Sequence, residues 1–408
     1  MALVAALLVP VGENVVAAPA GAATPVAPCG KGNATGATDT GVTNKSITIA
    51  TIQDIGGPRP GLFTNEQKTM EGFVAYCNSL GGINGRTLNL VKYDSALLDA
   101  FAQYQKACDQ FAIVGEVLIF DDVGVKPTTA CGIPSVAGIS QPTRTRSDNV
   151  FNPSPNPGDK VALGRYQWLK KQFPGVQKSA AMLYANTATT QNSGDKQIAG
   201  MDQLGYDFAY KGVTEINVVN WGPFVNQLRQ HQTTYLTQVA DIVNWAGLER
   251  EMVAQGVKVK VTDATSTVYT PAFIQQAGSA AEGTLIGLTT AAFEDAKKLP
   301  ELQNYLKWVK KMGGTPTSVG VEVWSAGLLF ATAVQSLGSN VTRKGLMTAL
   351  KGIHQWDGNG IQGVADPGAK QPTGCFLYLQ VKNGKFVRLY PKQGFACSKA
   401  IATVPSAP

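Results

Sequence analysis

Apolar residues near the start of the chain recur with the periods of a strand, a helix and a second strand. Residues 47–52 are mostly β-branched and lack helical spacing, which is typical of a strand buried on both faces. In residues 65–80 the apolar positions fall three or four residues apart, at Met70, Phe73, Val74 and Cys77. Residues 88–94 have the composition of another strand. This order predicts the strand–helix–strand unit of a parallel sheet.

The same alternation continues through most of the chain. Helical spacing is found in residues 99–111, 160–172, 193–204, 221–230 and 242–255. Strands are expected at residues 111–115, 132–138, 179–184, 207–212, 235–240, 257–262 and 280–287. Because 408 residues can bury more than one core, we expect an α/β protein with two lobes.

The last third of the chain adds three helices and a hairpin. Helices are predicted at residues 302–312, 323–337 and 342–350, the last of them capped by Thr342. Residues 323–337 are apolar nearly all round, so this helix should be buried where the chain returns to the first lobe. Strands at 375–381 and 385–389 flank Asn383-Gly384, a pair that favours a tight hairpin turn.

Composition and charge exclude some classes of partner. The chain is 44% hydrophobic and 15% charged, which is ordinary for a globular protein. The formal net charge of +7 comes from scattered Lys and Arg, without a basic run that contains aromatic residues. We therefore expect no nucleic-acid partner.

The first 23 residues have the features of an export signal. A short apolar core at 2–9 precedes small-residue cleavage sites at 17–23, although a positive start is missing. Residues 24–45 show no periodic pattern and are expected to be a disordered leader. No later segment looks long and apolar enough to span a bilayer. The mature protein should be soluble and extracytoplasmic, either secreted, periplasmic or associated with the cell surface.

Six cysteines in an exported chain predict disulfide bonds. Cys108 and Cys131 should lie at the ends of consecutive helices on one sheet face, and Cys375 and Cys397 should staple the terminal hairpin. Cys29 and Cys77 remain as the third pair. Lipid modification of Cys29 is the alternative, because the residues before it weakly resemble a lipobox, but Pro28 argues against it.

Motifs for catalysis and for cofactors are absent from the sequence. The two histidines, His231 and His354, have no nearby cysteine or acidic pair, and no serine has a G-x-S-x-G setting. Neither a Walker loop nor G-x-G-x-x-G occurs. Asp121 and Asp122 are adjacent acids that suit a solvated loop better than an acid/base pair. We expect no enzyme activity, no cofactor and no bound metal.

Several motifs resemble the type I periplasmic-binding-protein family, the solute receptors of ABC importers for branched-chain amino acids and amides. The first is the turn at residues 74–86, with Asn78, Gly81-Gly82 and Asn84-Gly85-Arg86, followed by a strand that ends in Tyr93-Asp94. Others follow in the family's order, at residues 112–115 (AIVG), 132–134 (GIP), 149–153 and 280–283 (AAEG). The resemblance runs from about residue 47 to residue 389.

This resemblance implies two Rossmann-like lobes with parallel central sheets, joined by a multi-strand hinge. It assigns residues 46–152 and 319–356 to the first lobe, residues 153–318 and 357–397 to the second, and 398–408 to a tail. The chain should cross between lobes near Asn152, Val319 and Asp357. The implied partners are a small-molecule solute and an ABC permease, with the receptor a monomer. The alternative is an extracellular ligand-sensing domain of a signalling system.

The resemblance also places the ligand between the lobes, beyond the carboxyl ends of the strands. The loops at residues 54–59, 116–122 and 140–143 should face this crevice. The residues expected to contact the ligand, aligned with the family only approximately, are Asp54, Arg59, Glu116, Ser140, Gln141, Tyr184, Thr190, Asp241 and Tyr269.

The residues at the expected amino-acid contacts depart from the family's pattern. Ile119 and its neighbours replace the small hydroxyl residues that hold a carboxylate, and residues 264–267 stand where an acidic partner for an ammonium group is expected, with Asp263 beside them. A buried ammonium group without a charged partner costs several kcal/mol. Leucine, isoleucine and valine should therefore bind poorly, and a polar or aromatic solute is favoured.

Overall fold

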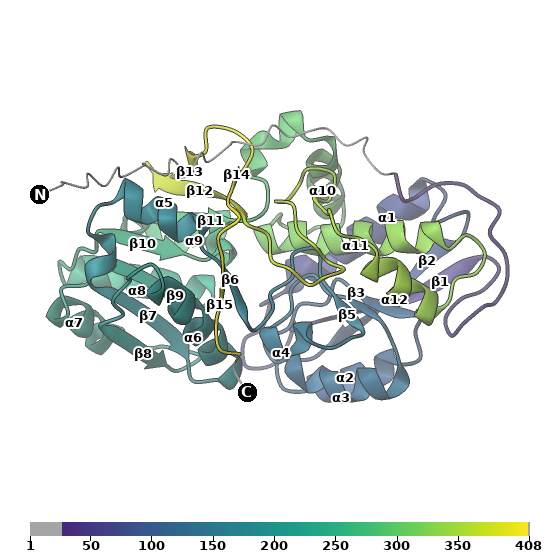
Figure 1. Cartoon of the computed structure of the whole chain (residues 1–408), viewed down its shortest axis with the longest axis horizontal. Coiled ribbons are helices and arrows are strands. Elements are labelled where there is room, and N and C mark those ends of the chain that lie inside the picture. The colour runs from purple at the N-terminus through teal and green to yellow at the C-terminus, as the bar shows by residue number, and fades with distance from the viewer. Residues whose placement is uncertain (1–26, 407–408) are drawn as a thin grey trace, which may run out of the picture.

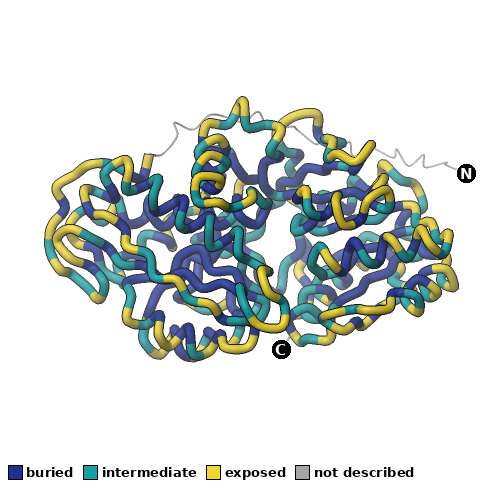
Figure 2. The backbone as a smooth tube through the Cα atoms, turned by 180° about the vertical axis from the view of Figure 1, so that it is seen from behind, coloured by how far each residue is buried: buried dark blue, intermediate teal, exposed yellow. Residues whose placement is uncertain are grey.

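Two α/β lobes lie side by side in the structure, a computed structural model that describes residues 27–406 (Figure 1). The predicted export signal at residues 1–23 lies outside the described residues. We call the lobe that contains β1 the N-lobe and the lobe that contains β7 the C-lobe. In Figure 1 the N-lobe is on the right and the C-lobe on the left. Figure 2 shows that the buried backbone runs through the interior of each lobe.

The N-lobe is built on a parallel sheet of order β2-β1-β3-β4-β5. Its strands are β1 (Ser46–Gln53), β2 (Thr87–Asp94), β3 (Ala112–Val114), β4 (Ser135–Val136) and β5 (Val150–Phe151). The helices of its first part are α1 (Thr64–Ser79), α2 (Ala100–Ala107), η1 (Asp122–Gly124), α3 (Val125–Cys131) and α4 (Pro142–Thr145). The helices that return to it are α10 (Pro300–Lys311), α11 (Ser318–Ser336) and α12 (Arg343–Lys351).

Strand β1 is buried on both faces, which confirms the prediction from its β-branched composition. Ile47 and Ile49 pack into the cluster formed with α1, α10, α11 and α12. Ala50 and Ile52 pack into the cluster formed with α2 and α3 on the opposite face. The period of two along a strand thus divides its side chains between two helical layers.

The C-lobe contains a larger mixed sheet of order β13-β12-β11-β10-β9-β7-β8. The parallel strands are β7 (Ala180–Ala185), β8 (Tyr210–Thr214), β9 (Tyr235–Val239), β10 (Val261–Ala264) and β11 (Leu285–Leu288). Antiparallel strands complete one edge, namely β12 (Cys375–Lys382), β13 (Lys385–Tyr390) and β14 (Ala396–Cys397). Asn383 and Gly384 have positive φ in the β12–β13 turn, which confirms the predicted hairpin.

Helices cover both faces of the C-lobe sheet. They are α5 (Gly164–Gln172), α6 (Ala188–Asp202), α7 (Gly222–Gln230), α8 (Ile242–Ala254) and α9 (Pro271–Ala277). Short 3-10 helices are η2 (Val176–Lys178), η3 (Ser266–Val268), η4 (Gly278–Ala281) and, in a connection between the lobes, η5 (Phe293–Lys298). Strand β6 (Lys160–Ala162) pairs with β15 (Ile401–Thr403), and the two lie between the lobes in Figure 1. The predictions of a helix over residues 160–162 and of a terminal tail at 398–408 are therefore wrong, because β15 supplies a strand partner.

Three segments carry the chain between the lobes and form a hinge. They are residues 152–159, 289–299 and 353–374. The segments are bonded to one another: the Gly363 amide donates to the Thr289 carbonyl at 2.7 Å, and Gln362 Nε2 donates to the Pro153 carbonyl at 2.7 Å. Several connections that touch one another can bend together, as a hinge between two lobes requires.

The chain returns to the N-lobe earlier than the sequence predicted. Leu302, Tyr305 and Val309 of α10 are buried in the N-lobe core, where α10 packs against α1. The crossing expected near Val319 is therefore wrong and lies at residues 289–299 instead. The apolar face of α10 determines this, since it needs the α1 surface for burial.

Residues 27–45 are ordered against the turn after α1, contrary to the predicted disordered leader. Cys29 is disulfide-bonded to Cys77, and the Arg86 guanidinium donates to the carbonyls of Thr35, Gly36 and Thr43. Gly85 has φ +88°, and a Cβ there would lie 2.3 Å from the Gly32 carbonyl oxygen. The Asn-Gly-Arg turn therefore holds this segment in place.

The structure confirms the predicted disulfides. Cys108 is bonded to Cys131, and Cys375 to Cys397. Cys29 and Cys77 form the third bridge, so the Cys29 sulfur is disulfide-bonded and not available for lipid modification. Within residues 27–406 no cysteine is free.

Helix α11 lies in the N-lobe core. By length and composition alone it could cross a membrane, contrary to the expectation that no segment after the export signal could do so. In the structure, 83% of its apolar window is buried inside the protein. Trp324 is fully buried and donates from Nε1 to Glu301 Oε1 at 2.8 Å. The helix thus confirms the prediction of a buried return helix.

Candidate functional site

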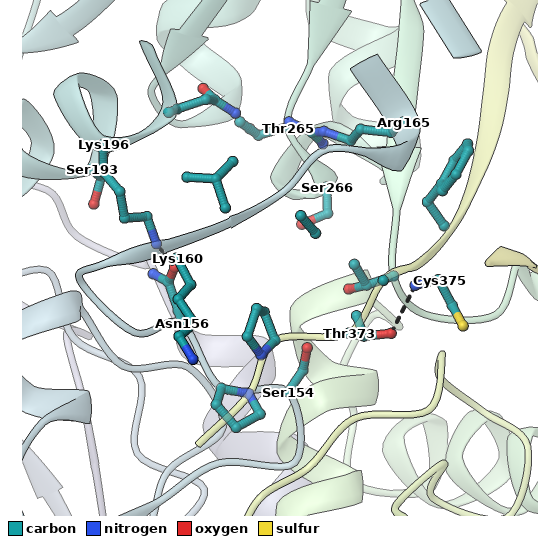
Figure 3. Close-up of a pocket in the computed structure, with 18 of the residues that line it drawn as sticks. Ser154, Asn156, Lys160, Arg165, Ser193, Lys196, Thr265, Ser266, Thr373 and Cys375 are labelled. Carbon is teal, nitrogen blue, oxygen red and sulfur yellow. Dashed lines mark hydrogen bonds between the residues drawn. The ribbon is translucent and has the colours of Figure 1, made fainter. Parts of the chain in front are cut away.

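A cavity of about 360 Å³ lies between the two lobes (Figure 3). The N-lobe contributes Ile139 and Ser140 from the loop after β4, and Glu322 from α11. The first and third hinge segments and the C-lobe supply most of the other lining residues, including Ser154, Asn156, Lys160, Val161, Arg165, Tyr166, Ser193, Lys196, Gln197, Val239, Thr265, Ser266, Thr373 and Phe376. Because both lobes line it, a solute bound there contacts both at once.

The fold brings the ends of several elements to this cavity. Val239 ends β9, and Thr265 and Ser266 follow β10, so the C-lobe presents carboxyl ends of parallel strands. Arg165 lies in the first turn of α5, and Lys196 in the middle of α6. This is the position at which open α/β sheets bind ligands.

Three cationic side chains and one carboxyl line the cavity. The cations are Lys160, Arg165 and Lys196, and the carboxyl belongs to Glu322. Within residues 27–406, none of the four takes part in an ion pair within 4.0 Å. The cavity is thus richer in positive charge and in hydrogen-bond donors than in acidic groups.

Arg165 is held in place by its neighbour Tyr166 and keeps donors for the cavity. Its guanidinium lies 4.5 Å from the centre of the Tyr166 ring, and Nη2 donates to the Tyr166 hydroxyl at 2.5 Å. A Cβ at Gly287 would lie 2.9 Å from Arg165 Nη1, so glycine leaves room for the arginine. A guanidinium carries five N–H donors, and the structure shows one of them bonded within the described part of the chain.

Lys196 and Lys160 are anchored to the hinge region by neutral acceptors. Lys196 Nζ donates to the Pro157 carbonyl at 3.0 Å and to the side-chain oxygen of Asn156. Lys160 Nζ donates to Gln371 Oε1 at 2.8 Å. Each ammonium has three donors, so both retain capacity for a further acceptor.

Burial shifts the pKa of two groups in the cavity. Burial lowers the pKa of Lys196 to about 8, against the opposing charge of Asp159. Burial also raises the pKa of Glu322 to about 8, and the Thr289 hydroxyl, which donates to Oε1 at 3.4 Å, opposes the rise. Near neutral pH, Glu322 is therefore mostly protonated and Lys196 mostly charged.

Of the nine residues expected to contact a ligand, Ser140 lines the cavity. Its side chain is buried, and its hydroxyl lies 2.6 Å from Thr145 Oγ1 and 2.9 Å from Asn152 Oδ1. The other eight lie outside the cavity lining and have protein partners. As ligand contacts, all nine stay predictions.

Asp54 and Glu116 lie inside the N-lobe. Asp54 accepts hydrogen bonds from the Leu97 and Ile119 amides at 3.1 and 2.8 Å, and burial raises the pKa of its carboxyl. Glu116 is fully buried and paired with Arg144 at 3.2 Å. Both carboxylates therefore tie N-lobe loops together at the carboxyl edge of the sheet.

Arg59, Asp241 and Gln141 form contacts between the lobes. The Arg59 guanidinium, from the loop after β1, forms an ion pair with Asp241 at the start of α8 and donates to Asn217 Oδ1 at 2.5 Å. Gln141 Oε1 accepts from Ser193 Oγ at 3.1 Å. The N-lobe loops thus face the crevice but reach C-lobe side chains.

Tyr184, Thr190 and Tyr269 lie within the C-lobe. The Tyr184 hydroxyl lies 3.4 Å from Asp195 Oδ1, and Thr190 Oγ1 donates to the Ala185 carbonyl at 2.6 Å. Tyr269 donates to Glu294 Oε2 at 2.7 Å. Their hydrogen bonds fix the strand ends and loops around the cavity.

Asp263, the acid beside the expected ammonium position, is buried among tyrosines. It accepts from the hydroxyls of Tyr235 at 2.7 Å and Tyr378 at 3.3 Å. Burial raises its pKa, and the nearby positive charge of Arg165 opposes that rise. Asp263 therefore lies among tyrosine hydroxyls, close enough for its charge to act on Arg165, and does not line the cavity.

Sequence reasoning missed all four charged groups of the cavity. Lys160 and Arg165 fall in a stretch that was assigned to a single helix, Lys196 falls in another predicted helix, and Glu322 comes directly before the predicted helix at residues 323–337. One signal was available: Lys160 and Arg165 follow directly on the first crossing between lobes. Within the described residues, no group of three or more His, Cys, Asp or Glu side chains is arranged to hold a metal ion.

Comparisons with known proteins agree with this geometry. The model of a family described as periplasmic binding protein matches residues 46–385. A search of curated proteins gave no match. Among solved structures, a fatty acid ABC transporter substrate-binding protein from Thermomonospora curvata has 19% identity and a TM-score of 0.75, covering 89% of this chain and 95% of that one.

Two further structures with bound ligands are similar. The branched-chain amino acid transporter substrate-binding protein of Streptococcus pneumoniae, in complex with isoleucine, has 15% identity and a TM-score of 0.67, covering 88% of this chain and 99% of that one. An ABC transporter solute-binding protein of R. palustris, in complex with benzoate, has 18% identity and a TM-score of 0.67, covering 89% and 98%. At these identities the likeness shows a shared fold.

Proposed function

The chain belongs to the periplasmic binding protein family, and we propose that it is the extracytoplasmic solute-binding receptor of an ABC importer. The observation that carries this proposal is the cavity between the lobes, lined by Ser140 and Glu322 of one lobe and by Arg165 and Lys196 of the other. The proteins of similar fold are ABC transporter receptors.

Closure of the lobes explains how a permease could distinguish a receptor with bound solute from one without it. A solute gains contacts from both lobes only when they are closed, so it favours the closed state by its difference in affinity for the two states. Arg59 with Asp241 and Gln141 with Ser193 add protein contacts across the same cleft. The permease would then recognise the closed pair of lobes.

The proposed partners are one small solute and the permease, with the receptor acting as a monomer. The cavity volume lies near the lower end of the range of about 300–1,000 Å³ that is usual for small-molecule sites. We retain the prediction that the chain is not an enzyme, because its family and the proteins of similar fold bind solutes for transport. An extracytoplasmic location agrees with the family and with the three disulfides.

A thermal-shift screen of the purified, disulfide-intact protein tests this function. Amino acids, amides, urea, short-chain acids and aromatic acids form the panel, and a cognate solute should stabilise the protein by about 2.7 kcal/mol at one hundred times its Kd. Ser266→Phe should abolish the shift by filling the cavity, whereas Ser279→Phe, at an exposed C-lobe position, should preserve it. A screen in which no solute stabilises the protein contradicts the proposal.

A further inference from the structure

We propose that the solute is an organic carboxylate without an ammonium group, bound between Arg165 and Lys196. This inference rests on the proposed receptor function and specifies the class of solute. Figure 3 shows that the two cations approach the cavity from opposite sides. The cavity therefore offers positive charge to the solute from two directions.

Arg165 and Lys160 both carry hydrogen-bond donors that no described protein group uses. Arg165 has one described hydrogen bond, to the Tyr166 hydroxyl, and Lys160 has one, to Gln371. Partly buried cationic donors gain most from an anionic acceptor, because charge-assisted hydrogen bonds are about twice as strong as neutral ones. A carboxylate is a planar acceptor that suits a guanidinium fork.

Two acidic groups near the cations, Asp263 and Asp159, lie outside the cavity lining. Asp263 is absent from the cavity lining and accepts hydrogen bonds from Tyr235 and Tyr378. Asp159, whose charge acts on Lys196, is also absent from the cavity lining. Neither acid lines the cavity or forms an ion pair with these cations, so Glu322 is the acidic group that the described lining offers.

Among residues 27–406, Glu322 is the one acidic side chain in the lining, and its protonation state decides between a carboxylate and an amino acid. It belongs to the N-lobe, and its described hydrogen bond comes from Thr289 at 3.4 Å. An amino acid would need Glu322, ionised, as the partner of its ammonium group. A protonated Glu322 can instead donate a hydrogen bond to a carboxylate.

Apolar side chains line the remaining cavity and suit the body of such an acid. Ile139 of the N-lobe and Val239 and Phe376 of the C-lobe contribute to this part of the lining, together with Val161 of β6. These groups fit an aliphatic or aromatic carbon skeleton. Apolar surface buried between the skeleton and these side chains would stabilise the complex. The inferred solute thus combines a carboxylate head with an apolar body.

Calorimetric titration of the disulfide-intact chain with matched solutes tests the inference. The probes are 4-methylpentanoate, leucine and 4-methylpentanamide, with 3-phenylpropionate, phenylalanine and 3-phenylpropanamide as the aromatic set. Within each set the molecules differ only in charged groups. We expect at least one carboxylate to bind ten-fold or more tightly than its amino acid and its amide.

Variants assign the binding to the proposed groups. Arg165→Met and Lys196→Met should each weaken carboxylate binding by about ten- to hundred-fold, and Arg165→Lys should restore part of the loss. The matched control is Lys310→Met, which replaces an exposed lysine on α10 and should leave the Kd for the carboxylate unchanged. Glu322→Gln should weaken carboxylate binding less than either cation variant does, because a neutral amide can still donate. Circular dichroism of each variant confirms that it is folded.

The opposite pattern overturns the inference. Tighter binding of leucine or phenylalanine, lost in Glu322→Gln, would show that Glu322 anchors an ammonium group, and the receptor function would stand. Binding of amides alone, or of inorganic phosphate in place of carboxylates, would also refute the proposal that the solute is an organic carboxylate. Failure of all six probes refutes it as well, while the wider thermal-shift screen decides the receptor function independently.

Discussion

Charged residues in the cavity should make solute binding depend on pH. As pH rises through about 8, Glu322 loses its proton and becomes negative, and Lys196 loses its proton and becomes neutral. Both changes weaken the attraction for an anion, while Arg165 keeps its charge. Carboxylate affinity should therefore be greatest below pH 8 and fall above it, by up to about tenfold per pH unit for each titrating group.

Titration calorimetry between pH 6.5 and 9.5 measures this dependence. In Glu322→Gln the fall in affinity should be shallower, because glutamine does not titrate. Lys196, with Asp159 and Lys160 as charged neighbours, is then the group that still loses its charge. Affinity that is constant or rises through this range would contradict the assignment of these two groups.

Glu116 is a residue for which the sequence suggested a ligand contact and the structure shows a structural contact. Its carboxylate pairs with the fully buried Arg144, which also donates to Thr128 Oγ1 at 2.7 Å and lies over the Tyr104 ring. Glu116→Ala leaves that guanidinium buried and unpaired, so it should destabilise the protein by about 3–5 kcal/mol. Urea unfolding measures the loss.

The effect on binding distinguishes the two roles of Glu116. If the side chain acts only inside the N-lobe, the folded fraction of Glu116→Ala should bind the solute with little change in Kd. A variant of normal stability with much weaker binding would instead place Glu116 at the ligand.

Residue roles were harder to predict than residue positions. The loops that contain Arg59, Glu116 and Ser140 do lie at the carboxyl edge of the N-lobe sheet, as strand order implied. Which polar side chains point into the cavity depends on loop conformation and on the other lobe. Charged partners far apart in sequence, such as Arg59 and Asp241, cannot be paired from local pattern.

Secondary-structure elements followed from apolar periodicity where burial is local. The first strand and helix end within about one residue of their predicted limits, because a β-branched run buried on both faces marks the strand and one apolar face marks the helix. The predictions were wrong where a partner that is distant in sequence determines the local structure. Strand β6 was predicted to be helical because its partner β15 lies some 240 residues later, and the ordered segment at residues 27–45 depends on the Cys29–Cys77 bridge and on Arg86.

The loop after β1 and helix α8 are connected by an ion pair that should favour closure. The Arg59 and Asp241 side chains are 15% and 21% exposed, so we expect a modest contribution, up to about 1 kcal/mol. Arg59→Ala should weaken solute binding roughly two- to fivefold. The control is Arg250→Ala, on the exposed face of α8, which should bind normally.

Calorimetry on these two variants also tests the earlier expectation for Arg59. A loss of a hundredfold or more would exceed what a partly exposed ion pair can supply, and it would indicate that Arg59 contacts the solute directly.

At the scale of the whole molecule, two-lobed architecture was predictable because each lobe repeats the strand–helix alternation. The return to the N-lobe was misplaced by about twenty residues, since the sequence of α10 shows an amphipathic helix but not which lobe covers its apolar face. The hinge itself consists of irregular segments bonded to one another, a feature that no periodic pattern reveals.

The central claim is that the lobes close on a small solute held in the cavity between them. Small-angle X-ray scattering of the protein, alone and saturated with a solute that stabilises it, measures this most directly. The account predicts a smaller radius of gyration with solute, and no such change in Ser266→Phe. An identical scattering profile at saturation would contradict it.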